Sequence, residues 1–203
     1  MSEADKKYPV IVISRQYGAG GRSVAKGLSE KLGIPWYDKD IMKKTAEESG
    51  ISEENIKQAG EQVNRTMHFM SIFAPVTYES ETDVIQRAQE EVILNLAKEG
   101  PCIIIGRCAN ALLKKVGIPN LSVFLYADID QRAKRAAELG ENGTLELKRY
   151  IAKRDNMRAG YYKTYTGHDQ GDFKDYNICL DTGCIGYDKA VEIIAAMAES
   201  MKQ

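Results

Sequence analysis

The chain has 203 residues, which suits one compact α/β domain with room for an inserted subdomain but not for a second full domain. Charged residues make up 28% of the chain, yet the formal net charge is −1, so we expect no overall field that favours nucleic acid or a membrane surface. No apolar run approaches the about 20 residues needed to span a bilayer, and "MSEADKKYP" lacks a signal-peptide core, so we expect a cytoplasmic protein.

The N-terminal part predicts a strand, a glycine loop, a helix and a second strand. The stretch "PVIVIS" (9–14) is apolar and rich in β-branched residues, as is typical of a buried parallel strand. Apolar residues at four-residue spacing predict a helix from Ser23 that stops at Gly33. The stretch "IPWYD" then predicts the second strand.

The middle of the chain predicts two helices on either side of a segment that is hard to interpret. The first helix is predicted at "DKDIMKKTAEESG" (38–50), ending at Gly50, and the second over 83–98 from its apolar face. Between them, "MHFMSIFAPV" (67–76) is apolar without clear periodicity. It either packs within an inserted subdomain or forms a contact between subunits, which would make the protein a homo-oligomer.

The remaining chain alternates strands and helices. Strands are predicted at "PCIIIGR", "LSVFLYA" and "YNICLDTG", with helices over 109–116, after a cap at Asp130, and at the C-terminus. This alternation predicts a parallel sheet covered by helices on both faces. Ligands of such sheets bind beyond the carboxyl ends of the strands, where this sequence has Arg15, the glycine loop, Asp38, Arg107, Asp128 and Asp181.

The stretch "VISRQYGAGGRSVAKGL" (12–28) predicts a phosphate-binding loop. Between a strand and a helix, several backbone N–H groups can point at one anion, and the helix N-terminus adds about half a positive charge. Ser23 stands where a hydroxyl ligates Mg²⁺. A bare tight turn is the alternative, whereas a dinucleotide loop is disfavoured because no glycine follows at the last position of its pattern.

The lysine usual in such loops is missing. In one register Gly21-Arg22-Ser23 replaces G-K-[ST], so that Arg22 stands for lysine. In the other, "GAGGRS" aligns with G-x-G-K-G-T, which preserves the glycines better and puts Gly21 at the lysine position. Loss of one such cation would cost about 10²–10³ in rate unless it is replaced, and Arg15 and Arg22 flank the loop on both sides.

Three other features provide candidate ligands. Arg107 follows an apolar strand and a glycine, and its planar fork suits bidentate contact with an acceptor phosphate. In residues 148–163, Arg154 and Arg158 share a helical face, which either covers a transferring phosphate or is a solvated basic surface. Asp38 either hydrogen-bonds a sugar or base or caps the helix that follows it.

Other polar and aromatic residues favour structural roles. Asp128 and Asp130 follow a strand, where helix capping is favoured. The tyrosines at 161, 162 and 165 either pack in the fold or stack on a base. The cysteines show no C-x-x-C or Cys/His spacing, which predicts reduced, structural thiols at positions 102, 108, 179 and 184.

These motifs together resemble the cytidylate kinase-like family of P-loop proteins over nearly the whole chain. The resemblance rests on "ISRQYGAGGRSVA", "LGIPWYDKDIM", "IIIGR", "KRDNMRAGYY" and "GDFKDYNICLDT", in this order. It implies one α/β domain over 1–203 with the three-layer P-loop NTPase fold and a five-stranded parallel sheet ordered 2-3-1-4-5. It also implies a helical acceptor-binding insertion at about 39–95 and a lid at about 138–172.

The resemblance also assigns roles to individual residues. Asp38 would lie by the acceptor nucleoside, Arg107 on its phosphate, and Arg154 and Arg158 over the transferring group. The ATP phosphates would be held by Gly18, Ala19, Gly20, Gly21, Arg22 and Ser23. The chain departs from the family's pattern in lacking the loop lysine and in having "GRC" where cytidylate kinases have G-R-D.

The sequence therefore predicts ATP- and Mg²⁺-dependent phosphoryl transfer to a small acceptor, in particular a nucleoside monophosphate. Ser23 is the predicted metal ligand, and Arg15 joins the loop residues as a predicted ATP-phosphate ligand. The predicted catalytic residues are Arg22, Arg107, Arg154 and Arg158. A nucleotide-binding regulatory module with little turnover is the alternative that the missing lysine supports, and the lid arginines argue against it.

Overall fold

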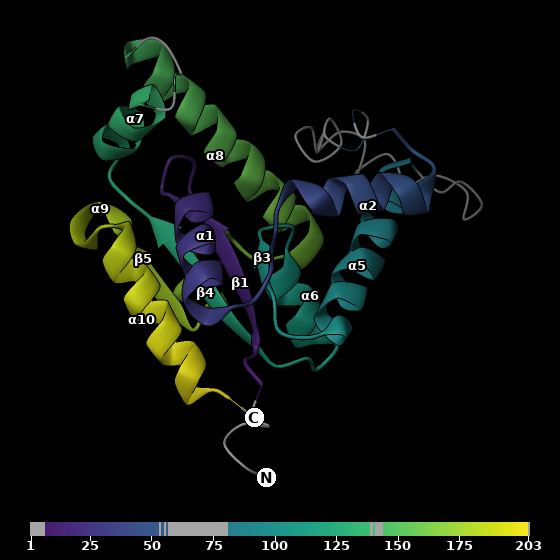
Figure 1. Cartoon of the computed structure of the whole chain (residues 1–203). Helices are drawn as coiled ribbons and strands as arrows, with labels where there is room; N and C mark the ends of the chain where they lie inside the picture. The colour runs from purple at the N-terminus through teal and green to yellow at the C-terminus, as the bar shows by residue number, and fades with distance from the viewer. Residues whose placement is uncertain are drawn as a thin grey trace.

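The computed structural model describes residues 7–52, 54, 56, 81–138, 140 and 144–202. The apolar stretch at 67–76, with its two predicted roles, lies outside these residues. Among the described residues no helix is both long and apolar enough to cross a membrane. Figure 1 shows the elements, which in chain order are β1 Val10–Arg15, α1 Gly21–Leu32, β2 Trp36–Tyr37, α2 Lys39–Ser49, α5 Glu81–Glu99, β3 Ile103–Ile105, α6 Ala109–Lys115, β4 Asn120–Tyr126, α7 Ile129–Glu138, α8 Thr144–Thr166, the 3₁₀ turn η2 Phe173–Asp175, β5 Ile178–Asp181, α9 Thr182–Ile185 and α10 Tyr187–Ser200.

The sheet has five parallel strands in the order β2-β3-β1-β4-β5, which confirms the predicted topology. The central strand β1 pairs with β3, where Ile11 lies opposite Ile103, and with β4, where Ile11 lies opposite Leu121. After β1 the chain adds β2 and β3 on one side of it, and it then crosses to add β4 and β5 on the other side. The carboxyl ends of β1 and β3 therefore border one crevice, where such sheets bind ligands.

Alternating residues of the strands face two hydrophobic layers. Ile11 and Ile13 are fully buried with residues of α1 and α10 on one face of the sheet. Val10 and Val12 are buried with residues of α2, α5 and α6 on the other face. Burial on both faces explains why the first four residues of β1, Val10 to Ile13, are all apolar rather than every second one.

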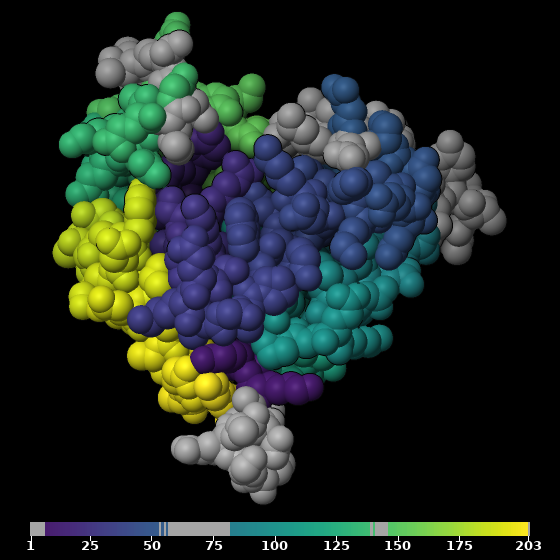
Figure 2. All heavy atoms as spheres, in the orientation of Figure 1, coloured from purple at the N-terminus to yellow at the C-terminus, as the bar shows by residue number. Residues whose placement is uncertain are grey.

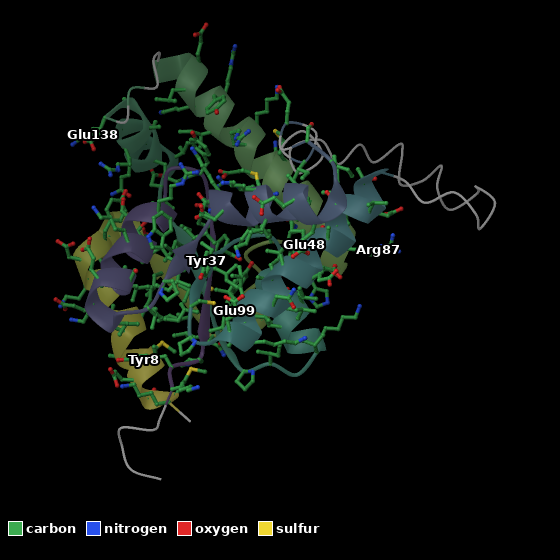
Figure 3. The ribbon with its side chains drawn as sticks, turned by 45° about the vertical axis from the view of Figure 1, so that its right-hand side comes forward. Tyr8, Tyr37, Glu48, Arg87, Glu99 and Glu138 are labelled. Carbon is green, nitrogen blue, oxygen red and sulfur yellow. The ribbon has the colours of Figure 1, made fainter. Side chains whose placement is uncertain are left out.

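Helices α7 and α8 stand beyond the carboxyl end of the sheet. They pack together through Ala133, Ala136, Leu147 and Ile151, with Tyr17 of the glycine loop against them. Figure 1 shows both helices at the end where α1 begins, and Figure 2 shows the start of α1 in the recess beneath them. At the opposite end, Tyr8 donates a hydrogen bond to Glu199 of α10 (Figure 3).

Two helix starts differ from the predictions. Helix α1 begins at Gly21 rather than Ser23, because Gly20 takes a left-handed φ of 80° and lets the chain turn two residues earlier. The expected cap at Asp130 is wrong, since Asp130 lies inside the first turn of α7. Asp128 has the capping role, because its Oδ1 accepts a hydrogen bond of 2.8 Å from the Asp130 N–H.

Candidate active site

Three hydrogen bonds tie the glycine loop to the end of β4 and to helix α9. The Gln16 N–H donates to the Leu125 carbonyl (2.9 Å), and Gln16 Oε1 accepts from the Ala127 N–H (3.2 Å). On the other side, Thr182 Oγ1 donates to the Ala19 carbonyl at 3.0 Å. These bonds fix the loop without any ligand, so it is organised for binding in advance.

The loop opens on a cavity of about 470 Å³, here called the loop cavity. The N–H groups in the first turn of α1 have no acceptor within the helix, and Gly20 at the N-cap has no side chain to satisfy them. Ala19 is 1% exposed and does not line the cavity. The lining residues are Arg15, Gln16, Tyr17, Gly18, Gly20, Gly21, Arg22, Ser23, Arg135, Ala136, Arg154 and Arg158.

A second cavity of about 200 Å³, here called the strand-end cavity, lies between the ends of β1 and β3 and helix α8. It shares four residues with the loop cavity, all of them arginines: Arg15, Arg22, Arg154 and Arg158. Its other lining residues are Asp38, Lys39, Met42, Arg107, Cys108, Met157, Tyr161 and Tyr162. The structure thus brings all the predicted charged residues of the site around two adjoining cavities.

Asp38 is the carboxylate of this arginine cluster. Its Oδ2 accepts a hydrogen bond of 2.5 Å from Arg22 Nε, and its Oδ1 lies 3.8 Å from Arg15 Nη2. Its side chain makes no capping bond to α2, so the capping alternative is wrong. One carboxylate facing several guanidinium groups leaves the cluster with an excess of positive charge, as an anion site requires.

The electrostatics of Arg15 and Arg158 reflect this excess. Burial, followed by the nearby Arg158, lowers the pKa of Arg15 to about 9. Burial also lowers the pKa of Arg158 from its ordinary value, and Asp155 opposes that shift. Both guanidinium groups remain charged at neutral pH, and a bound anion would relieve their mutual repulsion.

Arg107 follows β3 in an unusual backbone conformation. Arg107 and Cys108 have φ values of 59° and 54°, in the left-handed region that residues with a Cβ seldom adopt. Backbone strain of this kind is concentrated at binding and catalytic sites. It turns the chain sharply after Gly106, so that Arg107 and Cys108 both line the strand-end cavity.

A third cavity, here called the side cavity, has a volume of about 380 Å³ and continues from the strand-end cavity past Arg107, Cys108 and Tyr162. Helix α6 and the end of α8 form much of its wall. Tyr162 is 2% exposed, and its hydroxyl accepts a hydrogen bond of 2.9 Å from Asn110 Nδ2. Tyr162 therefore packs in the fold, but it also lines both cavities, so its stacking on a base stays a prediction.

Helix α8 is fastened to the glycine loop by one carboxylate. Asp155 accepts hydrogen bonds from the Tyr17 N–H (2.6 Å) and from Arg132 Nη1 (2.5 Å). Arg132 Nη1 also donates to the Tyr17 carbonyl at 3.0 Å. The Tyr17 ring lies 5.2 Å from the guanidinium carbon of Arg158, within the range of a cation–π contact.

Sequence reasoning missed Tyr17, Arg132 and Arg135. Arg135 Nη2 lies 3.5 Å from Ser23 Oγ, and its guanidinium stacks over the Tyr187 ring at 5.5 Å. An arginine on a surface helix gives no local signal of such a contact. The one sequence signal that could have pointed toward this cluster is Asp155, a carboxylate between Arg154 and Arg158 in α8.

The geometry agrees with comparisons to known proteins. The sequence profile of the cytidylate kinase-like family matches residues 10–183. The chain belongs to the cytidylate kinase-like family. One similar protein is the cytidylate kinase of Methanothrix thermoacetophila, which is 29% identical over 175 residues. The match covers 86% of this chain and 88% of the relative.

Solved structures place the chain among P-loop kinases in fold. An uncharacterized protein from Eubacterium ventriosum is similar with a TM-score of 0.70 and 25% identity, over 95% of this chain and 99% of that one. Shikimate kinase from Acinetobacter baumannii, solved with shikimate, has a TM-score of 0.56 and 15% identity, covering 98% of both chains. Family and fold together support phosphoryl transfer of the nucleotide-kinase kind.

Proposed function

We propose that the protein is an ATP- and Mg²⁺-dependent phosphotransferase whose acceptor is a small phosphorylated molecule, in particular a nucleoside monophosphate. The observation that carries this proposal is the sharing of four arginines by two adjoining cavities. Cations between a donor and an acceptor can hold both anions in line, which is the main requirement of phosphoryl transfer.

The loop cavity suits the donor. The free N–H groups at the start of α1, together with Gly18, Gly20 and Gly21, would hold the phosphates of ATP. Among the described residues there is no group of three or more His, Cys, Asp or Glu side chains that would hold a metal ion. Ser23 lines the cavity and fits as the protein's ligand for Mg²⁺, which in such enzymes neutralises charge on the phosphate oxygens.

The strand-end and side cavities suit the acceptor. Arg107 would bind the acceptor's phosphate, and Asp38 would lie beside its sugar or base. The side cavity of about 380 Å³ is large enough for the rest of a small metabolite. The acceptor oxygen already carries charge, so the reaction needs no strong general base in this cavity.

The proposal assigns roles to two regions of the chain. The segment at about 39–95 would be the acceptor-binding insertion, and the segment at about 138–172 the lid. Arg154 and Arg158 project from α8 into both cavities and would neutralise the charge that develops on the transferring group. Closure of α8 over the bound substrates would exclude water and limit hydrolysis of ATP.

A nucleotide-binding regulatory module is the second candidate, favoured by the absence of lysine from the described lining of the loop cavity. The deciding experiment is Mg²⁺-dependent ADP release from ATP, scanned across nucleoside monophosphates and common small phosphorylated metabolites. Stimulation by an acceptor supports the phosphotransferase and identifies its substrate class. Tight ATP binding without stimulation by any acceptor supports the regulatory module instead.

A further inference from the structure

The side chain of Arg15 passes close to Gly21, which stands at the lysine position in one of the two alignments of the loop. A Cβ added at Gly21 would lie 3.0 Å from Arg15 Cγ and 3.3 Å from Arg15 Cδ. Gly21 is in the first turn of α1 and is not among the glycines of positive φ, so its backbone does not require glycine. The Arg15 side chain instead leaves little room for a larger residue at this position.

The far end of Arg15 reaches the acceptor side of the sheet. A Cβ added at Gly106 would lie 2.2 Å from Arg15 Nη1, so the guanidinium rests against the turn that precedes Arg107. The side chain therefore runs from the end of β1, over the start of α1, to the end of β3. It lines the loop cavity and the strand-end cavity on the way.

Arg15 also retains positive charge for a ligand. Asp38 is 3.8 Å away and makes its shorter contact, of 2.5 Å, with Arg22. The Arg15 side chain is 20% exposed, whereas that of Arg22 is 62% exposed. Of the two arginines that flank the loop, Arg15 is thus the more buried and the less neutralised, and it carries the depressed pKa described above.

We propose that Arg15 replaces the P-loop lysine, its guanidinium bridging the transferring phosphoryl group of ATP and the anionic acceptor. This inference rests on the proposed phosphotransferase activity. In the reaction the γ-phosphorus forms a bond to an acceptor oxygen as its bond to the β–γ bridging oxygen breaks, and ADP leaves with that electron pair. Arg15 transfers no proton and stays charged, and its planar fork can contact one oxygen on each side.

The test removes the Arg15 cation and restores a lysine to the loop at position 21. We expect Arg15→Ala to lower the rate of acceptor-stimulated ADP release about 10²–10³-fold. Gly21→Lys should also be impaired, because a side chain at this position crowds that of Arg15 and displaces it. The double variant Arg15→Ala/Gly21→Lys should exceed Arg15→Ala by about tenfold or more, since the lysine then has room to act. A double variant no better than Arg15→Ala overturns the inference.

A second readout does not depend on turnover. Isothermal titration with Mg²⁺–ATP and Mg²⁺–ADP should show that Arg15→Ala weakens ATP binding about tenfold more than ADP binding, because the contact is to the terminal phosphate. Arg15→Lys, which keeps a cation, should retain part of the preference. The control is Lys26→Ala on the exposed face of α1, where Lys26 pairs with Glu30.

The binding data separate this inference from the proposed function. If the wild type prefers ATP and loses that preference in Arg15→Ala, but no acceptor stimulates turnover, Arg15 still contacts the terminal phosphate and the phosphotransferase proposal fails. The inference about Arg15 itself fails if Arg15→Ala weakens ATP and ADP binding equally. It fails as well if the wild type has no preference for ATP, or if Arg22→Ala has the larger effect.

Discussion

The loop cavity and the strand-end cavity share four arginines but are built in different ways. Three glycines line the loop cavity and have only backbone to offer there, and the loop is held by bonds between Gln16 and Ala127 and between Ala19 and Thr182 of α9. The strand-end cavity has no glycine in its described lining, whose residues come from β1, α1, the start of α2, the turn after β3, and α8. If the loop cavity takes the donor and the strand-end cavity the acceptor, as proposed, donor binding depends more on the course of the chain and acceptor binding more on individual side chains.

The two cavities should therefore tolerate substitution to different degrees among members of the family. A backbone cradle tolerates substitution of many side chains as long as its glycines and its anchors remain. A pocket of side chains changes specificity with a single replacement, such as Cys108 at the position where cytidylate kinases have aspartate. We therefore expect the donor to be the same throughout the family and the acceptor to differ.

The largest expected effect separates the two cavities. Arg107→Met should lower acceptor-stimulated ADP release about 10²–10³-fold, because it removes a preorganised cation from the acceptor side. The dissociation constant of Mg²⁺–ATP, measured by calorimetry, should change less than twofold. The matched control is Arg87→Met, since Arg87 projects from α5 away from the body of the protein (Figure 3). Loss of ATP affinity in Arg107→Met would contradict the division between the cavities.

The next effect tests the connection between α8 and the loop. Asp155→Asn leaves Arg132, 7% exposed in its side chain, without its carboxylate partner, and should destabilise the protein by about 3 kcal/mol. For a domain of this size that corresponds to a fall in Tm of about 6–12 °C by calorimetry. Asp169→Asn breaks the exposed pair with Lys163 and should cost under about 1 kcal/mol. Equal shifts would mean that Asp155 fastens nothing.

The strands and the glycine loop could be predicted because their signals are local. A run of β-branched residues, a glycine cluster and an amphipathic helix follow one another within about thirty residues, so their order alone indicates the βα unit. The sheet order came from the family resemblance rather than from the strands themselves. The helix start at Gly21 was missed because Gly20, not a polar cap, begins the helix.

The connections that complete the site could not be predicted, because they join residues far apart in the chain. Tyr17 and Asp155 are 138 residues apart, and Tyr17 and Arg132 are 115 residues apart. The choice between Arg15 and Arg22 as the replacement cation depends on which side chain crosses Gly21 and which one pairs more closely with Asp38. Neither the crossing of Gly21 nor the pairing with Asp38 can be read from the spacing of residues in the sequence.

A smaller effect tests whether the loop cavity depends on its anchors. Thr182→Val removes the hydroxyl that donates to the Ala19 carbonyl, which should destabilise the protein by about 1 kcal/mol and weaken ATP binding about fivefold. Thr45→Val removes a similar buried bond, from Thr45 Oγ1 to the Ile41 carbonyl in α2. Thr45→Val should lower Tm without changing ATP affinity. If both variants bind ATP like the wild type, the anchor is dispensable.

The smallest expected effect is in the rates at which the cysteine thiols are alkylated, which report on access to the strand-end cavity and require no activity measurement. Burial raises the pKa of Cys108 and of Cys102 to about 12, so at pH 8 only about 10⁻⁴ of each thiol is the reactive thiolate. Cys184 is exposed and should be alkylated first by iodoacetamide, as followed by mass spectrometry. Burial also raises the pKa of Cys179, which should react later than Cys184.

The order of alkylation then reports on the packing around Arg107. All four thiols should react in denaturant, which shows that the reagent is in excess and that protection comes from the fold. Cys108 adjoins Arg107, so rapid labelling of Cys108 in the native protein would mean that the turn after β3 opens without a ligand. The strained backbone at these two residues would then be an occasional state rather than the resting one, and the acceptor cavity would form on binding. Protection of Cys108 together with reaction of Cys184 would instead show that the acceptor side is preformed like the donor side.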